Sequence, residues 1–71
     1  MSKVCFSHRL KEIRKREKIT QVQLSKRLKV TQGAVAQWET GVTMPSLELL
    51  PKLAEILDCT TDELLGIAKK P

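Results

Sequence analysis

Few side chains in this sequence have the types and spacing that bond-making chemistry requires. The chain has one histidine, His8, and two cysteines, Cys5 and Cys59, that lie far apart in the sequence. A nucleophile with its base, a pair of catalytic carboxylates or a set of metal ligands would need more than these residues offer. The sequence also has no glycine-rich phosphate-binding loop. We therefore expect no enzyme activity, no metal site and no cofactor.

Three glutamines, Gln21, Gln32 and Gln37, offer a different chemistry, which is directional hydrogen bonding. A glutamine amide donates and accepts at the same time. It can therefore pair with adenine through two hydrogen bonds, because adenine presents a donor at N6 and an acceptor at N7 in the major groove of DNA. The elements that carry these glutamines decide whether they can reach a base.

The stretch 20–41 predicts two short helices that are joined by a tight turn. Thr20 and Gln23 have the spacing of a capping box, so the first helix should begin at Gln21. Leu24 and Leu28 are four residues apart and would form the buried side of this helix. The next residues, 29–30, are expected to end it.

The second helix of this stretch is expected over residues 32–39. Thr31 would cap it, Val35 and Trp38 would be its buried positions, and Gly41 would end it in the left-handed conformation. Two helices with about three linking residues make a helix-turn-helix, whose second helix can enter a major groove. Gln32, Gly33, Ala36 and Gln37 would then lie on its outward side.

The remaining helices follow from apolar spacing and capping residues. Phe6, Leu10 and Ile13 indicate a helix over about residues 6–17. Ser46 is expected to cap a fourth helix with an apolar stripe of Leu47, Leu50, Leu53, Ala54 and Leu57, in which Pro51 is tolerable if regular helix begins near it. Thr60 and Glu63 predict a capping box for a fifth helix over residues 61–65, which Gly66 would end.

The charge of the chain is unevenly distributed. Its 71 residues are enough for one domain with a net charge of +5, but residues 1–38 carry a net +8 and residues 39–71 a net −3. This polarity suggests that one side faces a polyanion, although small helical proteins often have solvated charged surfaces too. No apolar stretch approaches the ~20 residues of a membrane span, and no signal peptide is evident. We therefore expect a cytoplasmic protein without a membrane partner.

Several segments, in this order, resemble the Cro and phage-repressor type of helix-turn-helix, also called the XRE family. The resemblance runs from about Phe6 to Gly66 and is carried by Thr20-Gln21, Leu24-Ser25, Val30-Thr31-Gln32, Trp38-Glu39-x-Gly41, Pro45-Ser46-Leu47-Glu48 and Asp62-Glu63-Leu64-Leu65-Gly66. It implies an all-α, compact five-helix, lambda-repressor-like domain that comprises residues 1–71. Residues 1–5 would be a flexible arm and residues 67–71 a short tail.

The resemblance also implies roles for individual residues. In related phage repressors a glutamine at the place of Gln32 reads adenine, and a second glutamine, here Gln21, braces it. Arg14 is expected to pair with Glu39 beneath the recognition helix, although it could instead contact phosphate. The expected base contacts are Gln32, Gly33, Ala36 and Gln37, the phosphate contacts are Thr20, Gln21, Thr31, Thr40 and Thr43, and the supporting residues are Arg14, Val35, Trp38 and Glu39.

Two positions depart from the family pattern. Lys29 stands where the family often has glycine in a left-handed turn, and a lysine there would cost about 1 kcal/mol. The loop over residues 42–45 lacks the lysine or arginine that related repressors often place against phosphate. The outward side of the recognition helix has no arginine for guanine either, so we expect a half-site rich in A/T base pairs.

The leading hypothesis is a repressor-like, phage-like regulator that binds double-stranded DNA as a dimer on a palindromic operator. The dimer seam would include Met44, Leu57, Leu64 and Ile67, although Leu57 and Leu64 could belong to the core, and dimerisation could require DNA. The alternative is a protein-interaction module, such as an antitoxin or an adaptor, with the same fold. RNA is less well supported because the chain lacks a set of stacking aromatic residues. No small-molecule ligand is expected.

Overall fold

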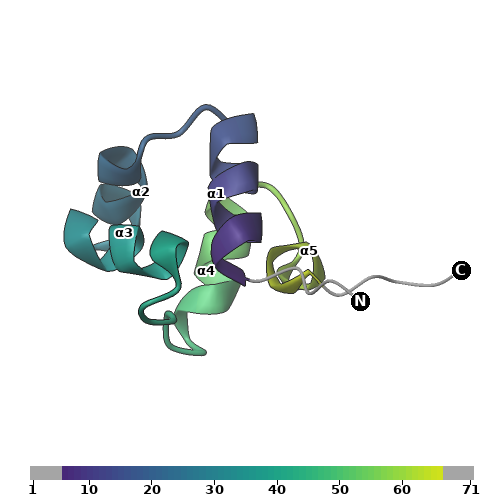
Figure 1. Ribbon diagram of the computed structural model, residues 1–71. Helices are drawn as coiled ribbons and strands as arrows, with labels where there is room; N and C mark the ends of the chain where they lie inside the picture. Colours follow the sequence, from purple (N-terminus) through teal and green to yellow (C-terminus); the bar gives the residue numbers. More distant parts are fainter. Residues whose placement is uncertain (1–5, 67–71) are drawn as a thin grey trace, which may run out of the picture.

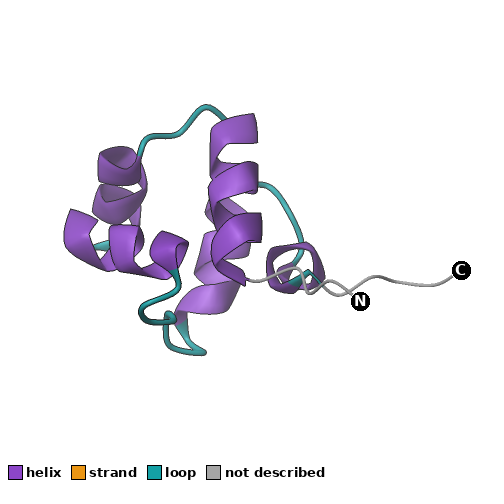
Figure 2. Ribbon diagram, in the orientation of Figure 1, coloured by secondary structure: helices purple, strands orange, loops and turns teal. Residues whose placement is uncertain are grey.

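The computed structural model describes residues 6–66, and this part of the chain forms five α-helices (Figure 1). They are α1 (Phe6–Arg16), α2 (Gln21–Leu28), α3 (Gln32–Thr40), α4 (Leu49–Ile56) and α5 (Thr61–Leu65). Within residues 6–66 there is no strand (Figure 2), so the predicted all-α, five-helix fold is confirmed. The predicted arm and tail, with Cys5 and Ile67, lie outside the described residues.

The helices α2 and α3 lie side by side at one end of the molecule and α5 lies at the other, with α1 and α4 between them (Figure 1). α1 packs against both α3 and α5, and α4 packs against α2 and α5. This arrangement encloses one apolar core that consists of Phe6, Leu10, Ile13, Leu24, Leu28, Val35, Trp38, Leu50, Leu53, Ala54, Leu57 and Leu64. One side of α3 therefore packs against the core, and its other side faces solvent.

Four helices end with the same backbone motif. Lys18, Lys29, Gly41 and Asp58 have positive φ values of 59°, 61°, 83° and 54°. Each donates its N–H to the carbonyl three residues back, and the residue after it donates to the carbonyl five residues back, which is the Schellman pattern. The expected left-handed conformation of Lys29 is thus confirmed. Three of these four positions carry a side chain where glycine would be free of strain.

One apolar residue follows the left-handed residue in each short junction between helices. Ile19, Val30 and Cys59 are partly buried against the core. Each of them also directly precedes the threonine that caps the next helix. The same side chain therefore helps to close one helix and to open the next.

The predicted Ser46 cap of α4 was wrong, whereas regular helix does begin near Pro51, as expected. The helix begins at Leu49, and its N-cap residue, Glu48, makes no side-chain capping hydrogen bond. Ser46 contributes its backbone carbonyl to the N–H of Leu49, and Leu47 is 83% exposed and not part of the stripe. Pro51 is the third residue of the helix, where a backbone N–H has no intrahelical partner, so the missing donor costs no hydrogen bond.

Candidate nucleic-acid interface

The predicted helix-turn-helix is present between Gln21 and Thr40. Thr20 accepts a hydrogen bond from the N–H of Gln23 at 3.0 Å, and its own N–H donates to Oε1 of Gln23 at 2.9 Å, which completes the capping box. Thr31 caps α3 by accepting from the N–H of Ala34 at 3.1 Å. Both helix starts are therefore fixed by side chains, with three residues between the helices.

The two sides of α3 differ sharply in burial. Val35, Trp38 and Glu39 are buried, whereas Gln32, Gly33 and Gln37 are exposed and Ala36 is half-buried. A Cβ atom built on Gly33 would meet only the Thr31 hydroxyl oxygen, at 3.9 Å, so this position lies on open surface. The exposed side of α3 thus carries two amides and small residues, and no charged side chain.

A buried ion pair joins α1 to α3. Nε of Arg14 donates to Oε2 of Glu39 at 2.5 Å, and Nη2 donates to Oε1 at 3.0 Å. The two side chains are 11% and 2% exposed. Nη1 of Arg14 also donates to the backbone carbonyl of Ile19 at 2.7 Å, which ties the same guanidinium to the turn before α2. The predicted pair is present, with the two-pronged geometry that gives the strongest arginine–carboxylate contacts.

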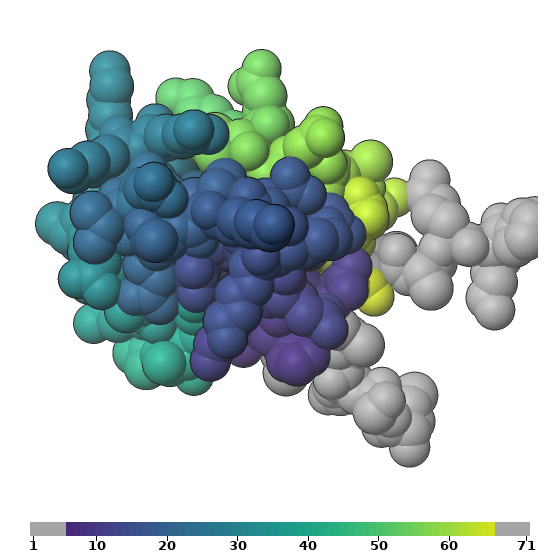
Figure 3. Space-filling view, turned by 90° about the horizontal axis from the view of Figure 1, so that it is seen from above, coloured from purple at the N-terminus to yellow at the C-terminus, as the bar shows by residue number. Residues whose placement is uncertain are grey.

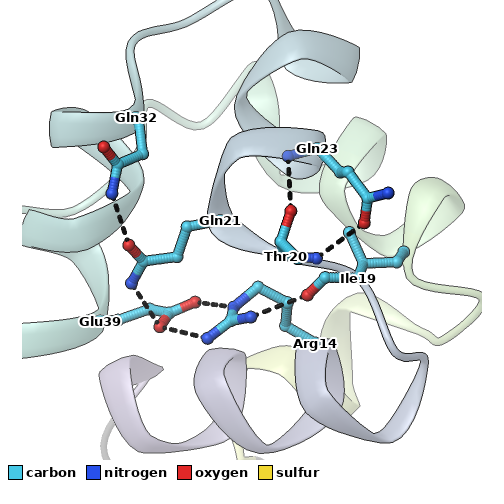
Figure 4. A network of polar contacts seen from close by, with 7 residues as sticks. All are labelled: Arg14, Ile19, Thr20, Gln21, Gln23, Gln32 and Glu39. Carbon is cyan, nitrogen blue, oxygen red and sulfur yellow. Dashed lines mark hydrogen bonds and ion pairs between the residues drawn. The ribbon is translucent and has the colours of Figure 1, made fainter.

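Two glutamines extend this ion pair to the surface (Figure 4). Nε2 of Gln21 donates to Oε1 of Glu39 at 3.0 Å, and Nε2 of Gln32 donates to Oε1 of Gln21 at 2.9 Å. The predicted contact between Gln21 and Gln32 is therefore present. The contact between Gln21 and Glu39 was not predicted, because it depends on how α2 packs across α3 and no sequence spacing signals it.

The residues that were expected to contact phosphate are accessible to solvent. Thr20, Thr31, Thr40 and Thr43 are exposed, and Gln21 is half-buried. The hydroxyl of Thr40 donates to the carbonyl of Gln37 at 3.2 Å, whereas the capping hydroxyls of Thr20 and Thr31 accept hydrogen bonds. A capping hydroxyl keeps its own proton for donation, which is the hydrogen bond that a phosphate oxygen accepts.

Positive charge lies on α1, α2 and the turns after them. The end of α1, its turn and α2 form a continuous part of the surface in Figure 3. These segments carry the exposed basic residues Lys11, Lys15, Arg16, Lys18, Lys26, Arg27 and Lys29. From residue 30 to residue 51 there is no lysine or arginine. These exposed basic residues therefore precede α3 in the sequence, and the loop that follows α3 has none.

The expected dimer seam is only partly available at the surface. Leu57 and Leu64 are fully buried in the core, which is the alternative that the sequence left open for them, so they are not available to a seam. Met44 is 57% exposed, and it is accompanied by Val42 at 68% and Leu47 at 83%. An exposed apolar loop thus follows α3, and clustered exposed apolar side chains are typical of surfaces that bind another molecule.

Other reactive side chains lie away from α3. His8 is exposed and lies 3.7 Å from a carboxylate oxygen of Glu12. Burial, followed by the nearby Glu63 carboxylate, raises the pKa of the half-buried Cys59 thiol, which favours its protonated and unreactive form. In the described part of the chain, no group of three or more histidine, cysteine or acidic side chains could hold a metal ion. The helices over residues 6–66 are all too short to cross a membrane.

The fold, with α3 packed across α2 and one uncharged side of α3 exposed, defines a helix-turn-helix domain. The helix-turn-helix family model matches residues 10–64, and the chain belongs to the Cro and phage-repressor type, the XRE family. It is 35% identical over 61 residues to the HTH-type transcriptional activator BcrR of Enterococcus faecalis, with 86% of this chain and 30% of the relative covered. It is 39% identical over 62 residues to the HTH-type transcriptional regulator AnsR of Bacillus subtilis, with 87% of this chain and 53% of the relative covered.

A phage protein gives the structural comparison. The chain is 37% identical over 65 residues to Repressor protein C2 of Salmonella phage P22, which covers 92% of this chain and 30% of the relative. The crystal structure of the P22 c2 repressor in complex with a synthetic operator has a TM-score of 0.85 at 35% identity, covering 93% of this chain and 100% of that chain. This chain thus spans between about a third and a half of the curated relatives and nearly all of that crystallised domain.

Proposed function

We propose that this protein is a sequence-specific regulator of transcription that binds double-stranded DNA with α3, residues 32–39, in the major groove. The observation that carries the proposal is the exposed Gln32, which is held at the start of α3 by a hydrogen bond to Gln21. A recognition helix contacts base edges with its N-terminal residues. The names of the relatives, which include an activator, a regulator and a repressor, support a regulatory role.

The exposed side of α3 supports a preference for A/T base pairs. Gln32 pairs with adenine, and Gln37 is a second polar reader five residues further along α3. Gly33 and Ala36 have no polar side-chain atoms, so they allow close approach and offer contact to a thymine methyl group. No arginine on this side is available for guanine, whose usual partner in the major groove is arginine.

Phosphate contacts come from hydroxyls, amides and the start of α2. Thr20, Gln21, Thr31, Thr40 and Thr43 are the proposed contacts, and the free N–H groups of a helix N-terminus add to them. The basic residues of α1 and α2 supply longer-range attraction to DNA, which salt weakens. Because the loop after α3 is uncharged, we expect a shallower salt dependence than a repressor with a basic loop would show.

A dimer on a palindromic operator follows from the small footprint of one recognition helix. Two-fold pairing places two recognition helices about 34 Å apart on one face of DNA. Met44 is the proposed seam residue, and Val42 and Leu47 extend the same exposed apolar loop. Pairing occurs either in solution or only on the operator. We expect the protein to act in the cytoplasm, where bacterial and phage DNA lies.

Selection of random duplex DNA by the purified protein at near-physiological salt tests this proposal. The expected result is a palindrome of A/T-rich half-sites about one helical turn apart, with two chains bound per site in analytical ultracentrifugation. Recovery of no motif, with binding that vanishes as salt rises, would leave only phosphate attraction. The exposed apolar loop would then favour the second candidate, an interaction module for another protein.

A further inference from the structure

We infer that Glu39 is a specificity-determining residue: its buried carboxylate sets which amide atom of Gln32 faces the DNA. The residue lies on the buried side of α3, so its carboxylate is not exposed to contact a base directly. It acts through Gln21 in a chain of hydrogen bonds that runs from the core to the surface (Figure 4). The inference rests on the proposed function only in its last step, the reading of a base by Gln32.

The donor and acceptor roles in this chain of hydrogen bonds are fixed at its buried end, at Glu39. A guanidinium can only donate hydrogen bonds, and a carboxylate that faces it can only accept them. Arg14 donates to both carboxylate oxygens of Glu39, and Oε1 of Glu39 accepts a second hydrogen bond from Gln21. Because Glu39 is 2% exposed, water has little access to replace either partner. The group that contacts Glu39 from α2 must therefore be a donor.

This requirement passes from one amide to the next. Gln21 must turn Nε2 toward Glu39, which leaves its Oε1 facing Gln32. Gln32 must then donate with its own Nε2. If Gln21 were flipped, its Oε1 would face a carboxylate oxygen and its Nε2 would face another Nε2, so both hydrogen bonds would be replaced by repulsive contacts. The amide orientations of both glutamines thus follow from the charge of Glu39.

The exposed end of Gln32 is left with a defined pattern. One hydrogen of Nε2 is used by Gln21, so the free atoms are Oε1 as an acceptor and the other N–H as a donor. Adenine offers the matching donor at N6 and acceptor at N7, whereas guanine offers two acceptors, O6 and N7. The fixed Oε1 of Gln32 would repel O6 of guanine. The buried carboxylate therefore selects for adenine and also excludes guanine.

Replacement of the Glu39 carboxylate by an amide should reverse the donor and acceptor roles along this chain of hydrogen bonds. In the Glu39→Gln variant, the amide oxygen keeps the shorter contact, with Nε of Arg14, and the NH₂ group takes the place of Oε1. The NH₂ group gives up the hydrogen bond from Nη2 of Arg14 and donates to Gln21 instead. Gln21 would then turn, accept with Oε1 and donate with Nε2 to Oε1 of Gln32. Gln32 would present its NH₂ group to the DNA, which suits guanine. A residue that only stabilised the fold would weaken all binding without exchanging the preferred base.

A second variant removes the hydrogen bonds of Gln21 and leaves the ion pair of Arg14 with Glu39 intact. Gln21→Met keeps the length of the side chain but removes both hydrogen bonds, so Gln32 can turn freely. The matched control is Gln23→Met, which changes a glutamine two positions further along α2 that belongs to the capping box and not to the chain. Because Gln21 lies outside the ion pair, this variant keeps the inference testable if Glu39→Gln does not fold.

The first measurement uses the free protein. NMR of the side-chain amides should show slowed hydrogen exchange and a single orientation for the Gln32 NH₂ group in the wild type and in Gln23→Met, and loss of both in Gln21→Met. An unprotected Gln32 amide in the wild type would overturn the hydrogen-bond chain itself. This result does not involve DNA, so it is independent of the proposed function.

The second measurement compares adenine with guanine at the base pair whose preference is lost in Gln32→Ala. We expect the wild type and Gln23→Met to favour adenine, Gln21→Met to lose at least about tenfold of that preference, and Glu39→Gln to favour guanine relative to the wild type. An unchanged adenine preference in Gln21→Met would overturn the role of Glu39 and Gln21 in specificity. If Gln32→Ala changes no base preference, the proposed role of Gln32 fails, and with it the role inferred here for Glu39.

Discussion

The connections on the two sides of α3 are built in different ways. The turn before it, Lys29–Thr31, is three residues long, with a left-handed residue, a partly buried valine and a threonine that caps the next helix. The connection after it, residues 41–48, ends without a side-chain cap and exposes three apolar side chains. Both connections begin with the same left-handed motif, but only the first ends in a threonine cap, and only the second exposes large apolar side chains.

This difference suggests separate roles for the two connections. The turn before α3 fixes Gln32, the proposed base contact, for which a displacement of about 1 Å would spoil a hydrogen bond to a base. The connection after α3 lies at the opposite end of the helix from Gln32, and we propose that its exposed apolar side chains serve contacts with another chain. We therefore expect substitutions before α3 to change folding and specificity, and substitutions after it to change assembly.

Loss of the buried ion pair should give the largest effect. Glu39→Ala leaves the guanidinium of Arg14 without its carboxylate in a site that is 11% exposed, so unfolding free energy should fall by about 3–5 kcal/mol. Chemical denaturation followed by circular dichroism measures this. Glu12→Ala, which removes a carboxylate that is 54% exposed, is the control and should change stability by less than about 1 kcal/mol. Equal effects of the two variants would contradict the assigned burial.

The next largest effect should come from removing a helix cap, and it should differ between the start of α2 and the start of α4. Thr20→Ala should cost about 1 kcal/mol, because the N–H of Gln23 loses its acceptor. Ser46→Ala should change stability by less than about 0.5 kcal/mol, because Ser46 provides only its backbone carbonyl to the start of α4. Thermal unfolding of the two variants gives the comparison, and an equal loss in both would restore Ser46 as a cap.

Relief of strain in the turn should give a smaller change of opposite sign. Lys29→Gly places a residue without Cβ at φ 61°, so the protein should become about 0.5–1 kcal/mol more stable. Lys18→Gly and Asp58→Gly test the same motif at the ends of α1 and α4. Differential scanning calorimetry measures all three, and a uniform loss of stability would show that the replaced side chains contribute contacts that outweigh the strain.

Substitution in the exposed loop should have the smallest effect on folding. Met44→Gln and Leu47→Gln should change unfolding free energy by less than about 0.5 kcal/mol, because both side chains are largely exposed. Both should weaken binding to a palindrome while leaving binding to a single half-site unchanged, if this loop is the dimer seam. Gel-shift titration on the two DNAs measures this, and equal affinities for wild type and variants on the palindrome would remove the loop from the seam.

The parts of the fold that were predictable are those with local signals. Thr20 with Gln23 and Thr60 with Glu63 gave the starts of α2 and α5, and both capping boxes are present. The start of α4 has no such signal, since its N-cap residue, Glu48, forms no capping hydrogen bond. The pattern of leucines there was misleading, because Leu47 continues the helical spacing but lies in the preceding turn.

Two residue pairs of the candidate site were predictable, but the hydrogen bond that links the pairs was not. The pair of Arg14 with Glu39 and the contact of Gln21 with Gln32 followed from the family resemblance, and both are present. The hydrogen bond that joins the two pairs, from Gln21 to Glu39, depends on three helices meeting at one point. Likewise, leucines at core spacing do not reveal which of them face a partner, and Leu57 and Leu64 proved to be buried.

The most direct test of the account is the effect of Gln32→Ala on specificity. Binding of the wild type and the variant should be measured at near-physiological salt on the selected operator and on a scrambled duplex of the same length. We expect a loss of about 1–3 kcal/mol on the operator and almost none on the scrambled duplex. Equal losses on both DNAs, or no loss on either, would contradict the claim that Gln32 on α3 reads a base.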